Sequence, residues 1–146
     1  MRWVLVGLVL TASLAGAALA QNDQLTTDRI QWERVPNHEA FVRYVPHRAV
    51  NDQVSGAAHV CCTVNRRRHL DCQFAAESQP EYGFGDATVR FMRHFRMTES
   101  SYAEWQVNPE RIARTMRWYV GEPTAETHAR LAEFGQEVRG LCSAEP

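Results

Sequence analysis

The sequence predicts an α+β fold of two layers, in which a three-stranded antiparallel sheet carries a helix on one face and an additional helix follows at the C-terminus. Two segments that alternate polar and apolar residues flank a short polar connector. A segment with an apolar stripe at helical spacing comes next, and a third alternating segment follows it. With 146 residues, of which 45% are hydrophobic and 23% charged, the chain has the size and composition of one domain with a core.

The charge balance argues against a polyanionic partner. Lys and Arg together number 16 and Asp and Glu 17, so the formal net charge is -1. A domain that binds nucleic acid usually carries a clear positive excess, and we therefore expect no nucleic-acid partner. The cluster Arg66-Arg67-Arg68 is interpreted as a solvated turn, with contact to anionic headgroups as the alternative.

Residues 1–20 have the layout of a secretory signal peptide. Arg2 precedes an apolar run that ends in small residues, with Ala18 and Ala20 at the positions that a signal peptidase reads. An uncleaved anchor is the alternative, because the run is near the lower length limit of a membrane-spanning helix. We expect cleavage after Ala20, no stable membrane anchor afterwards, and a periplasmic protein.

The rest of the chain divides into three parts. Residues 21–31 are polar and are predicted to be a flexible tail. Residues 32–121 are expected to form the domain, and residues 122–146 a C-terminal helical extension.

Residues 57–64 and 69–77 predict a β-hairpin around the connector 65–68. Each strand has one apolar face, so a sheet with one buried face is expected. If the two apolar faces coincide, Cys62 lies opposite Cys72 and Val64 opposite Leu70. The apolar positions are Ala58, Val60, Cys62 and Val64 on the first strand and Leu70, Cys72, Phe74 and Ala76 on the second.

Export would place the four cysteines in a compartment where disulfides persist. The cross-strand position makes Cys62 with Cys72 the preferred bridge. Cys61 then points to the other face, and its partner is Cys142 or an external thiol. A soft-metal site is the alternative, but no C-x-x-C pair supports it and we expect no cofactor. Its ligands would come from His59, Cys61, Cys62, His69 and Cys72.

The elements after the hairpin follow from periodicity. Residues 86–95 predict a helix, because apolar residues recur at intervals of three or four. Residues 97–109 are predicted to be a loop, and residues 111–120 a third strand with a β-branched and aromatic end. A last helix is expected to start at Pro123 or Thr124. The first helix carries Phe84, Ala87, Phe91 and Phe95 on its stripe, and the last Leu131, Phe134, Val138 and Leu141.

The segment 44–97 resembles the C-terminal domain of the TonB family. Residues 44–49 (YVPHRA) and 54–58 (VSGAA) are similar to the family's entry motif. Residues 80–87 and 93–97 follow its order of a Pro, a Gly-rich turn and a helix that ends in RHFRM. A hairpin with a cysteine on each strand is similar to exported single-domain members, and the likeness extends loosely to Val120.

This resemblance implies a non-catalytic binding module connected with outer-membrane transport. In the family, the exposed last strand of the sheet accepts a short extended segment of an outer-membrane receptor, which is β-strand addition. The expected partner is therefore an extended peptide of an outer-membrane or periplasmic protein. By position, the peptide-binding edge would be formed by Arg114, Thr115, Met116, Arg117, Trp118, Tyr119 and Val120.

Three departures from the family narrow this expectation. Only residues 21–31 would separate the leader from the domain, so energy transduction by this chain alone is not expected. The hairpin tip at 65–68 has no glycine. The extension 122–146 could cover the proposed edge.

Two other functions stay open. One is a structural envelope protein whose sheet edge is covered by its own extension. The other is a thiol redox or metal-binding protein that uses Cys61. No nucleophile, base and orienting group occur in a recognisable pattern, so an enzyme is not expected.

Overall fold

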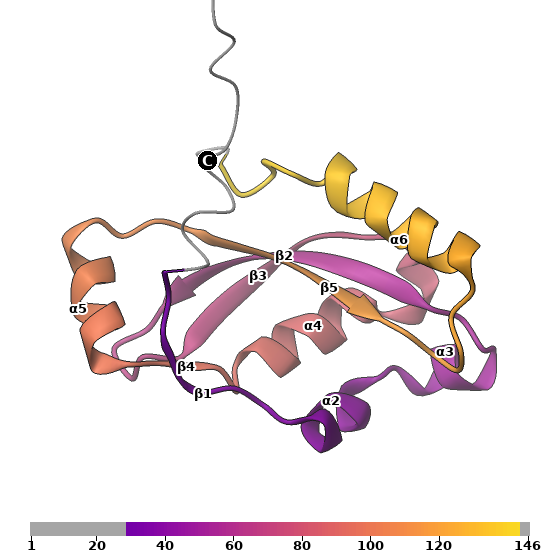
Figure 1. The fold of residues 1–146 in the computed structure, drawn as a ribbon, viewed down its shortest axis with the longest axis horizontal. Helices are drawn as coiled ribbons and strands as arrows, with labels where there is room; N and C mark the ends of the chain where they lie inside the picture. The colour runs from indigo at the N-terminus through magenta and orange to yellow at the C-terminus, as the bar shows by residue number, and fades with distance from the viewer. Residues whose placement is uncertain (1–28, 144–146) are drawn as a thin grey trace, which may run out of the picture.

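The computed structural model describes residues 29–143, and the predicted signal peptide 1–20 lies outside this range together with residues 21–28 of the predicted tail. Within it the fold is α+β, as predicted, and the main sheet is antiparallel with strand order β3-β2-β5 (Figure 1). A second, two-stranded sheet pairs β1 with β4. The elements in chain order are β1 (Trp32–Arg34), α2 (His38–Tyr44), α3 (His47–Asn51), β2 (Gly56–Val64), β3 (Leu70–Glu77), η1 (Pro80–Tyr82), α4 (Phe84–Met92), β4 (Arg96–Met97), α5 (Glu99–Val107), β5 (Ile112–Trp118) and α6 (Ala125–Glu137).

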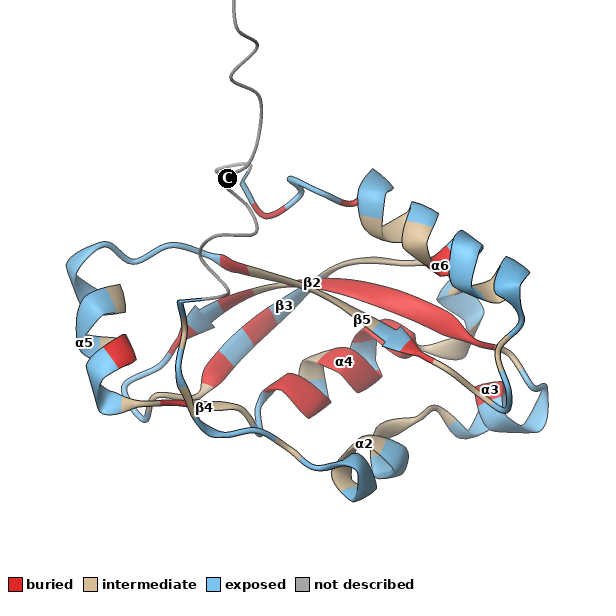
Figure 2. Cartoon of the chain, in the orientation of Figure 1, coloured by how far each residue is buried: buried red, intermediate tan, exposed pale blue. Residues whose placement is uncertain are grey.

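The main sheet lies between two helices. In Figure 1, α4 lies below the sheet and α6 above it. We call the two sides the α4 face and the α6 face. Because both faces of β2 are covered, seven of its nine residues are buried, including His59 on the side that alternation assigned as polar (Figure 2). On that side Cys61 is half-buried and Thr63 is exposed.

The hairpin has the predicted register. Cys62 pairs with Cys72 and Val64 with Leu70. The register then shifts between His59 and Val60, where β3 contributes one extra residue and forms a bulge. The bulge turns Ala76, which was expected on the apolar face, toward the α6 face as the partner of His59.

The bulge also brings Glu77 to the start of α4. Its Oε2 accepts a hydrogen bond of 2.7 Å from the main-chain N–H of Gly85. A carboxylate at this position satisfies an amide that the helix leaves unbonded and interacts favourably with the positive end of the helix dipole. The irregularity of β3 therefore positions α4 on the sheet.

The hairpin tip forms without a glycine because Asn65 and Arg68 stabilise the turn. Asn65 Oδ1 accepts from the N–H groups of Arg67, at 2.9 Å, and His69, at 3.1 Å. Arg68 takes the left-handed conformation, with φ of 68°. Its guanidinium pairs with Glu33 and donates to the Met97 carbonyl, so one of the three tip arginines connects the turn to β1 and β4.

The core on the α4 face is centred on Trp118, which is fully buried. Its indole N–H donates to the hydroxyl of Thr88 on α4 over 2.8 Å, and Phe41 of α2 stacks on its ring at 4.5 Å between centroids. Phe84, Ala87 and Phe91 of the predicted stripe are buried against it. The helix itself spans Phe84–Met92 rather than 86–95, because Gly83 starts it with φ of 77° and the chain turns after Met92.

The segment predicted as a loop at 97–109 is instead β4 followed by α5, and that prediction was wrong. Thr98 caps the helix by accepting a hydrogen bond of 3.3 Å from the Ser101 N–H. No continuous apolar stripe marks this helix, because only one part of it touches the core. Tyr102 and Trp105 make that contact, and the Trp105 indole also donates to the Glu110 carbonyl over 2.9 Å.

At the N-terminal boundary, the packed part of the chain starts before Trp32. Ile30 packs against the core. The Gln31 N–H donates a hydrogen bond to Ser101 Oγ, and the Gln31 carbonyl accepts one from the Thr98 N–H. These contacts connect the N-terminal segment to α5.

At the other end, α6 starts where predicted, with Thr124 as its N-cap. Leu131 and Val138 are buried, but Leu141, expected on the same stripe, is 47% exposed. The helix ends at Glu137 and the chain turns through Gly140, so Leu141 leaves the stripe and Cys142 is buried in its place. Among residues 29–143, no helix has the length and apolar character needed to cross a membrane.

Close contact between β2 and α4 makes Gly56 a sensitive position. A Cβ added there would lie 2.2 Å from Cε2 of Phe84, which is fully buried and cannot move aside. We predict that Gly56→Ala lowers the free energy of unfolding by about 1–3 kcal/mol, as overpacked cores do. Urea denaturation with the disulfides intact measures it.

The matched control for Gly56→Ala is Gly135→Ala. A Cβ at Gly135 would meet no atom closer than 3.7 Å, and Gly135 lies within a helix. That change should raise the free energy of unfolding by about 0.5–1 kcal/mol. Equal effects of the two substitutions would contradict this account of the β2–α4 contact.

Candidate functional site

The end strand β5 offers an edge for pairing. One side of β5 pairs with β2 over seven residue pairs without a bulge, from Gly56 with Trp118 to Cys62 with Ile112. No strand within residues 29–143 pairs with its other side, which we call the outer edge. An edge of this kind presents main-chain N–H and C=O groups that a further strand can bond.

Hydrogen bonds at both ends of the β2–β3 hairpin show which residues of β2 direct their main-chain groups to β3. The residues of β5 that face the outer edge follow from this. The Asn65 N–H donates to the His69 carbonyl and the Ser78 N–H donates to the Ala57 carbonyl, each over 2.9 Å. The main-chain N–H and C=O groups of odd-numbered residues of β2 thus face β3. Main-chain direction alternates along a strand, so even-numbered residues of β2 face β5.

The register carries this parity into β5. Even-numbered residues of β2 pair with even-numbered residues of β5, such as Ala58 with Met116. The even positions of β5 therefore bond to β2. Ala113, Thr115 and Arg117 direct their N–H and C=O groups to the outer edge.

The structure thus corrects the predicted edge of 114–120. Trp118 belongs to the core and turns its main chain to β2. Tyr119 and Val120 lie past the end of the strand, where the Val120 N–H donates to Ser55 Oγ over 2.9 Å. Ala113, which sequence reasoning left out, has its main chain at the outer edge, because the parity depends on pairing with β2.

Side chains of the predicted edge residues divide between the two faces. The Arg114 guanidinium lies 5.8 Å from the centre of the Trp32 ring. Met116 packs against the core of the α4 face. The side chains of Thr115 and Arg117 lie on the α6 face, where their atoms are the nearest neighbours of a Cβ placed on Gly135 of α6.

The C-terminal helix covers a face and not the outer edge. Its contacts with β5 are made through the side chains of Thr115 and Arg117. Beyond the strand, Tyr119 Oη lies 3.1 Å from Nδ1 of His128, and the Arg130 guanidinium donates to the Ser55 carbonyl over 3.1 Å. In Figure 1, α6 lies above the sheet while β5 lies toward the viewer.

Two disulfides hold opposite faces of β2. Cys62 bonds to Cys72 inside the hairpin, on the α4 face, which confirms the preferred pairing. Cys61, pointing the other way, bonds to Cys142 after α6 across a sequence separation of 81. The sequence left Cys142 or an external thiol as the partner of Cys61, and in the structure the partner is Cys142.

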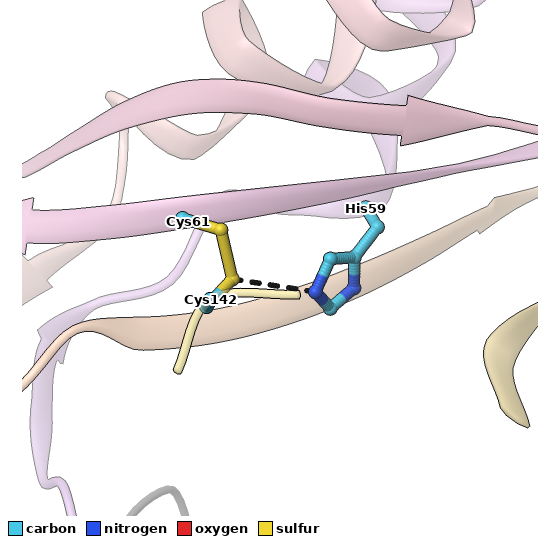
Figure 3. Close-up of side chains that lie close together, drawn as sticks. All are labelled: His59, Cys61 and Cys142. Carbon is cyan, nitrogen blue, oxygen red and sulfur yellow. Dashed lines mark hydrogen bonds between the residues drawn. A yellow bond between two sulfur atoms is a disulfide. The ribbon is translucent and has the colours of Figure 1, made fainter. Parts of the chain in front are cut away.

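A histidine lies against the second disulfide. Nε2 of His59 is 3.3 Å from Sγ of Cys142, and its Nδ1 is 2.8 Å from the hydroxyl of Thr115 (Figure 3). His59 is 4% exposed and Cys142 6%. Three residues of the two types that ligate soft metals, His and Cys, thus come together on the α6 face.

This cluster differs from the metal site considered from sequence. His59 and Cys61 belong to both, but Cys62 and Cys72 lie on the opposite face and are bonded to each other. His69 Nδ1 lies 3.0 Å from the Arg93 carbonyl instead. The missing member was Cys142, whose approach to His59 depends on the path of the chain after α6.

The surface of residues 29–143 includes two open grooves away from the cluster. The larger, of about 430 Å³, lies where α6 begins and is mostly polar. Tyr82, in its wall, donates to Asp52 over 3.3 Å, and partial desolvation together with that carboxylate raises the pKa of the phenol. The smaller groove, of about 370 Å³, lies beside the predicted entry motif, between Tyr44 and Arg90.

A scan of protein-family models and searches of curated proteins and solved structures give no match for this chain. The resemblance to the TonB C-terminal domain therefore stays a prediction.

The Cys61–Cys142 bridge should fix α6 on the sheet. We predict that replacing both cysteines with Ala lowers the free energy of unfolding by about 4 kcal/mol, the chain-entropy value for a loop of this length. Hydrogen exchange of the α6 amides should also rise. Urea denaturation and exchange measured by mass spectrometry test the two effects.

The paired control is Cys62→Ala with Cys72→Ala. That bridge closes a sequence separation of 10 and lies on the other face, so its loss should leave the exchange of α6 unchanged. Exchange in α6 that responds equally to both double variants would show that Cys61–Cys142 does not hold the helix.

Proposed function

We propose that this chain is an exported, non-catalytic peptide-binding domain that accepts an extended segment of an outer-membrane or periplasmic protein at the outer edge of β5. The observation that carries the proposal is the position of β5, an end strand whose outer edge no other strand of residues 29–143 pairs with. Ala113, Thr115 and Arg117 supply alternating donors and acceptors there. Affinity then comes mainly from main-chain hydrogen bonds and tolerates varied peptide side chains.

The geometry of β5 suits a partner of a different sequence better than a second copy. The strand contains no proline and no bulge, two devices by which natural edges avoid pairing. It does carry Arg114 and Arg117, with Arg111 just before it. Like charges brought opposite each other disfavour pairing between copies, whereas a peptide without them meets no such repulsion.

Export is supported by the chemistry of the cysteines. All four are in disulfides, and such bonds persist in oxidising compartments such as the periplasm. A signal peptide at residues 1–20 would deliver the chain there. A connection with outer-membrane transport rests on the TonB resemblance alone.

The position of α6 favours this proposal over a structural envelope protein with a self-covered edge. That alternative requires the extension to lie along the outer edge. Residues 125–143 instead lie over the α6 face, held by Leu131, Val138 and the Cys61–Cys142 bond.

Arg117 is the residue at which the proposal is best tested. Its side chain is exposed and its N–H is directed outward, so proline removes a donor without breaking a bond to β2. We predict that Arg117→Pro weakens peptide binding about tenfold or more relative to Arg117→Ala, which lacks the same side chain but keeps the N–H. Fluorescence anisotropy with labelled peptides from the periplasmic tails of outer-membrane receptors measures the Kd.

Near-ultraviolet circular dichroism first establishes that both Arg117 variants are folded. Equal affinities of the two folded variants would contradict edge binding, and so would the failure of every peptide to bind the wild-type chain. Trp118 is unsuitable for this purpose, because its N–H faces β2 and its side chain fills the core.

A further inference from the structure

The buried cluster on the α6 face combines two sulfurs and an imidazole. The ligand atoms of His59, Cys61 and Cys142 all lie within 4.8 Å of one another. His59 and Cys61 come from the same face of β2, two residues apart, and Cys142 comes from the turn after α6 (Figure 3). In the described structure the two sulfurs are bonded to each other, which leaves no thiolate for a metal.

The orientation of His59 is fixed by Thr115. Ligation through Nε2 requires the ring proton to be on Nδ1, and Thr115 Oγ1, 2.8 Å away, is positioned to accept it. Nε2 then faces Cys142 Sγ at 3.3 Å. Metal-binding histidines characteristically hold their second nitrogen in this way, which fixes the orientation of the ring.

We propose that the Cys61–Cys142 disulfide gates a binding site for Cu(I), formed after its reduction by the two thiolates and His59 Nε2. A dithiol reductant attacks one sulfur and breaks the S–S bond, and its second thiol resolves the mixed disulfide. The reductant becomes a disulfide and the protein gains two thiols, a two-electron exchange. Cu(I) then displaces both thiol protons, so the bound site carries one net negative charge.

The ligand set selects Cu(I) over the common divalent ions. Thiolates are soft ligands, and Cu(I) is the soft ion that two sulfurs and one nitrogen can satisfy. Structural zinc takes four ligands, and no fourth Cys, His, Asp or Glu joins this cluster within residues 29–143. Burial of His59 and Cys142 also keeps bulk water from completing a larger coordination shell.

Reduction gives the sulfurs room to separate around a metal. Cys61 is held in the centre of the sheet by the pairing of β2 on both sides. Cys142 lies in a turn past the end of α6, closed by hydrogen bonds from Leu141 to Val138 and from Ser143 to Gly140. A short turn after a helix adjusts by an ångström or so more readily than a central strand that is paired on both sides.

The test uses a background in which Cys61 and Cys142 are the only cysteines, Cys62→Ala with Cys72→Ala. The protein is reduced under anaerobic conditions and titrated with Cu(I) against a coloured chelator. We expect one Cu(I) per chain, no tight Cu(I) binding before reduction, and X-ray absorption showing two sulfurs and one nitrogen. The same titration on the reduced wild-type chain, with Cys61→Ala and Cys142→Ala as its comparison, covers the case in which this background does not fold.

Variants of the imidazole distinguish the proposed site from binding by thiols alone. His59→Gln should weaken Cu(I) binding by about 10- to 100-fold, and Thr115→Val by about tenfold, because it loses the contact that orients the ring. Thr63→Val is the matched control, since Thr63 is an exposed threonine of the same strand as His59, and should leave the affinity unchanged.

Three results would overturn the proposal: Cu(I) affinity that is unaffected by His59→Gln, Cu(I) retained at full affinity without Cys61 and Cys142, or displacement of Cu(I) by equimolar Zn(II). None of these measurements involves the outer edge of β5. Peptide binding by the oxidised protein and metal binding by the reduced protein can therefore fail separately.

Discussion

The strand β2 is paired along both edges and covered on both faces, and the positions of the other elements depend on it. β3 and β5 are its hydrogen-bonded neighbours, and α4 packs on its even-numbered side chains. On the other face, a disulfide joins Cys61 to Cys142 in the segment after α6. A strand in this position exposes little of either face, and of its nine residues only Thr63 is exposed. This explains why alternation predicted a polar face where the structure contains a buried His59.

The adjacent cysteines of β2 bond this strand to β3 on one face and to the segment after α6 on the other. Because successive side chains in a strand point to opposite faces, Cys61 and Cys62 cannot serve the same side of the sheet. Cys62 closes the hairpin on the α4 face, while Cys61 fastens the C-terminal segment on the α6 face. One bond thus stabilises local structure and the other a long-range contact, and only the second lies beside a histidine.

The same two-sided arrangement separates the two candidate activities in space. The outer edge of β5 uses main-chain groups in the plane of the sheet, whereas the cluster of His59, Cys61 and Cys142 uses side chains above it. They approach each other at Thr115, whose main chain belongs to the edge and whose hydroxyl contacts the imidazole. The side chains of Thr115 and Arg117 also lie beside Gly135 of α6, the helix that the Cys61–Cys142 disulfide follows.

The sequence by itself determined the elements whose evidence is local. Strand parity gave the pairing of Cys62 with Cys72, helical spacing gave the buried face of α4, and Thr124 gave the start of α6. Tertiary structure decided what depends on distant neighbours. It made α5 a helix without an apolar stripe, turned the main chain of Ala113, Thr115 and Arg117 outward through pairing with β2, and brought Cys142 to His59. A periodic pattern reports only which side of an element is buried, whereas the partner of a side chain is fixed by how separate elements pack together.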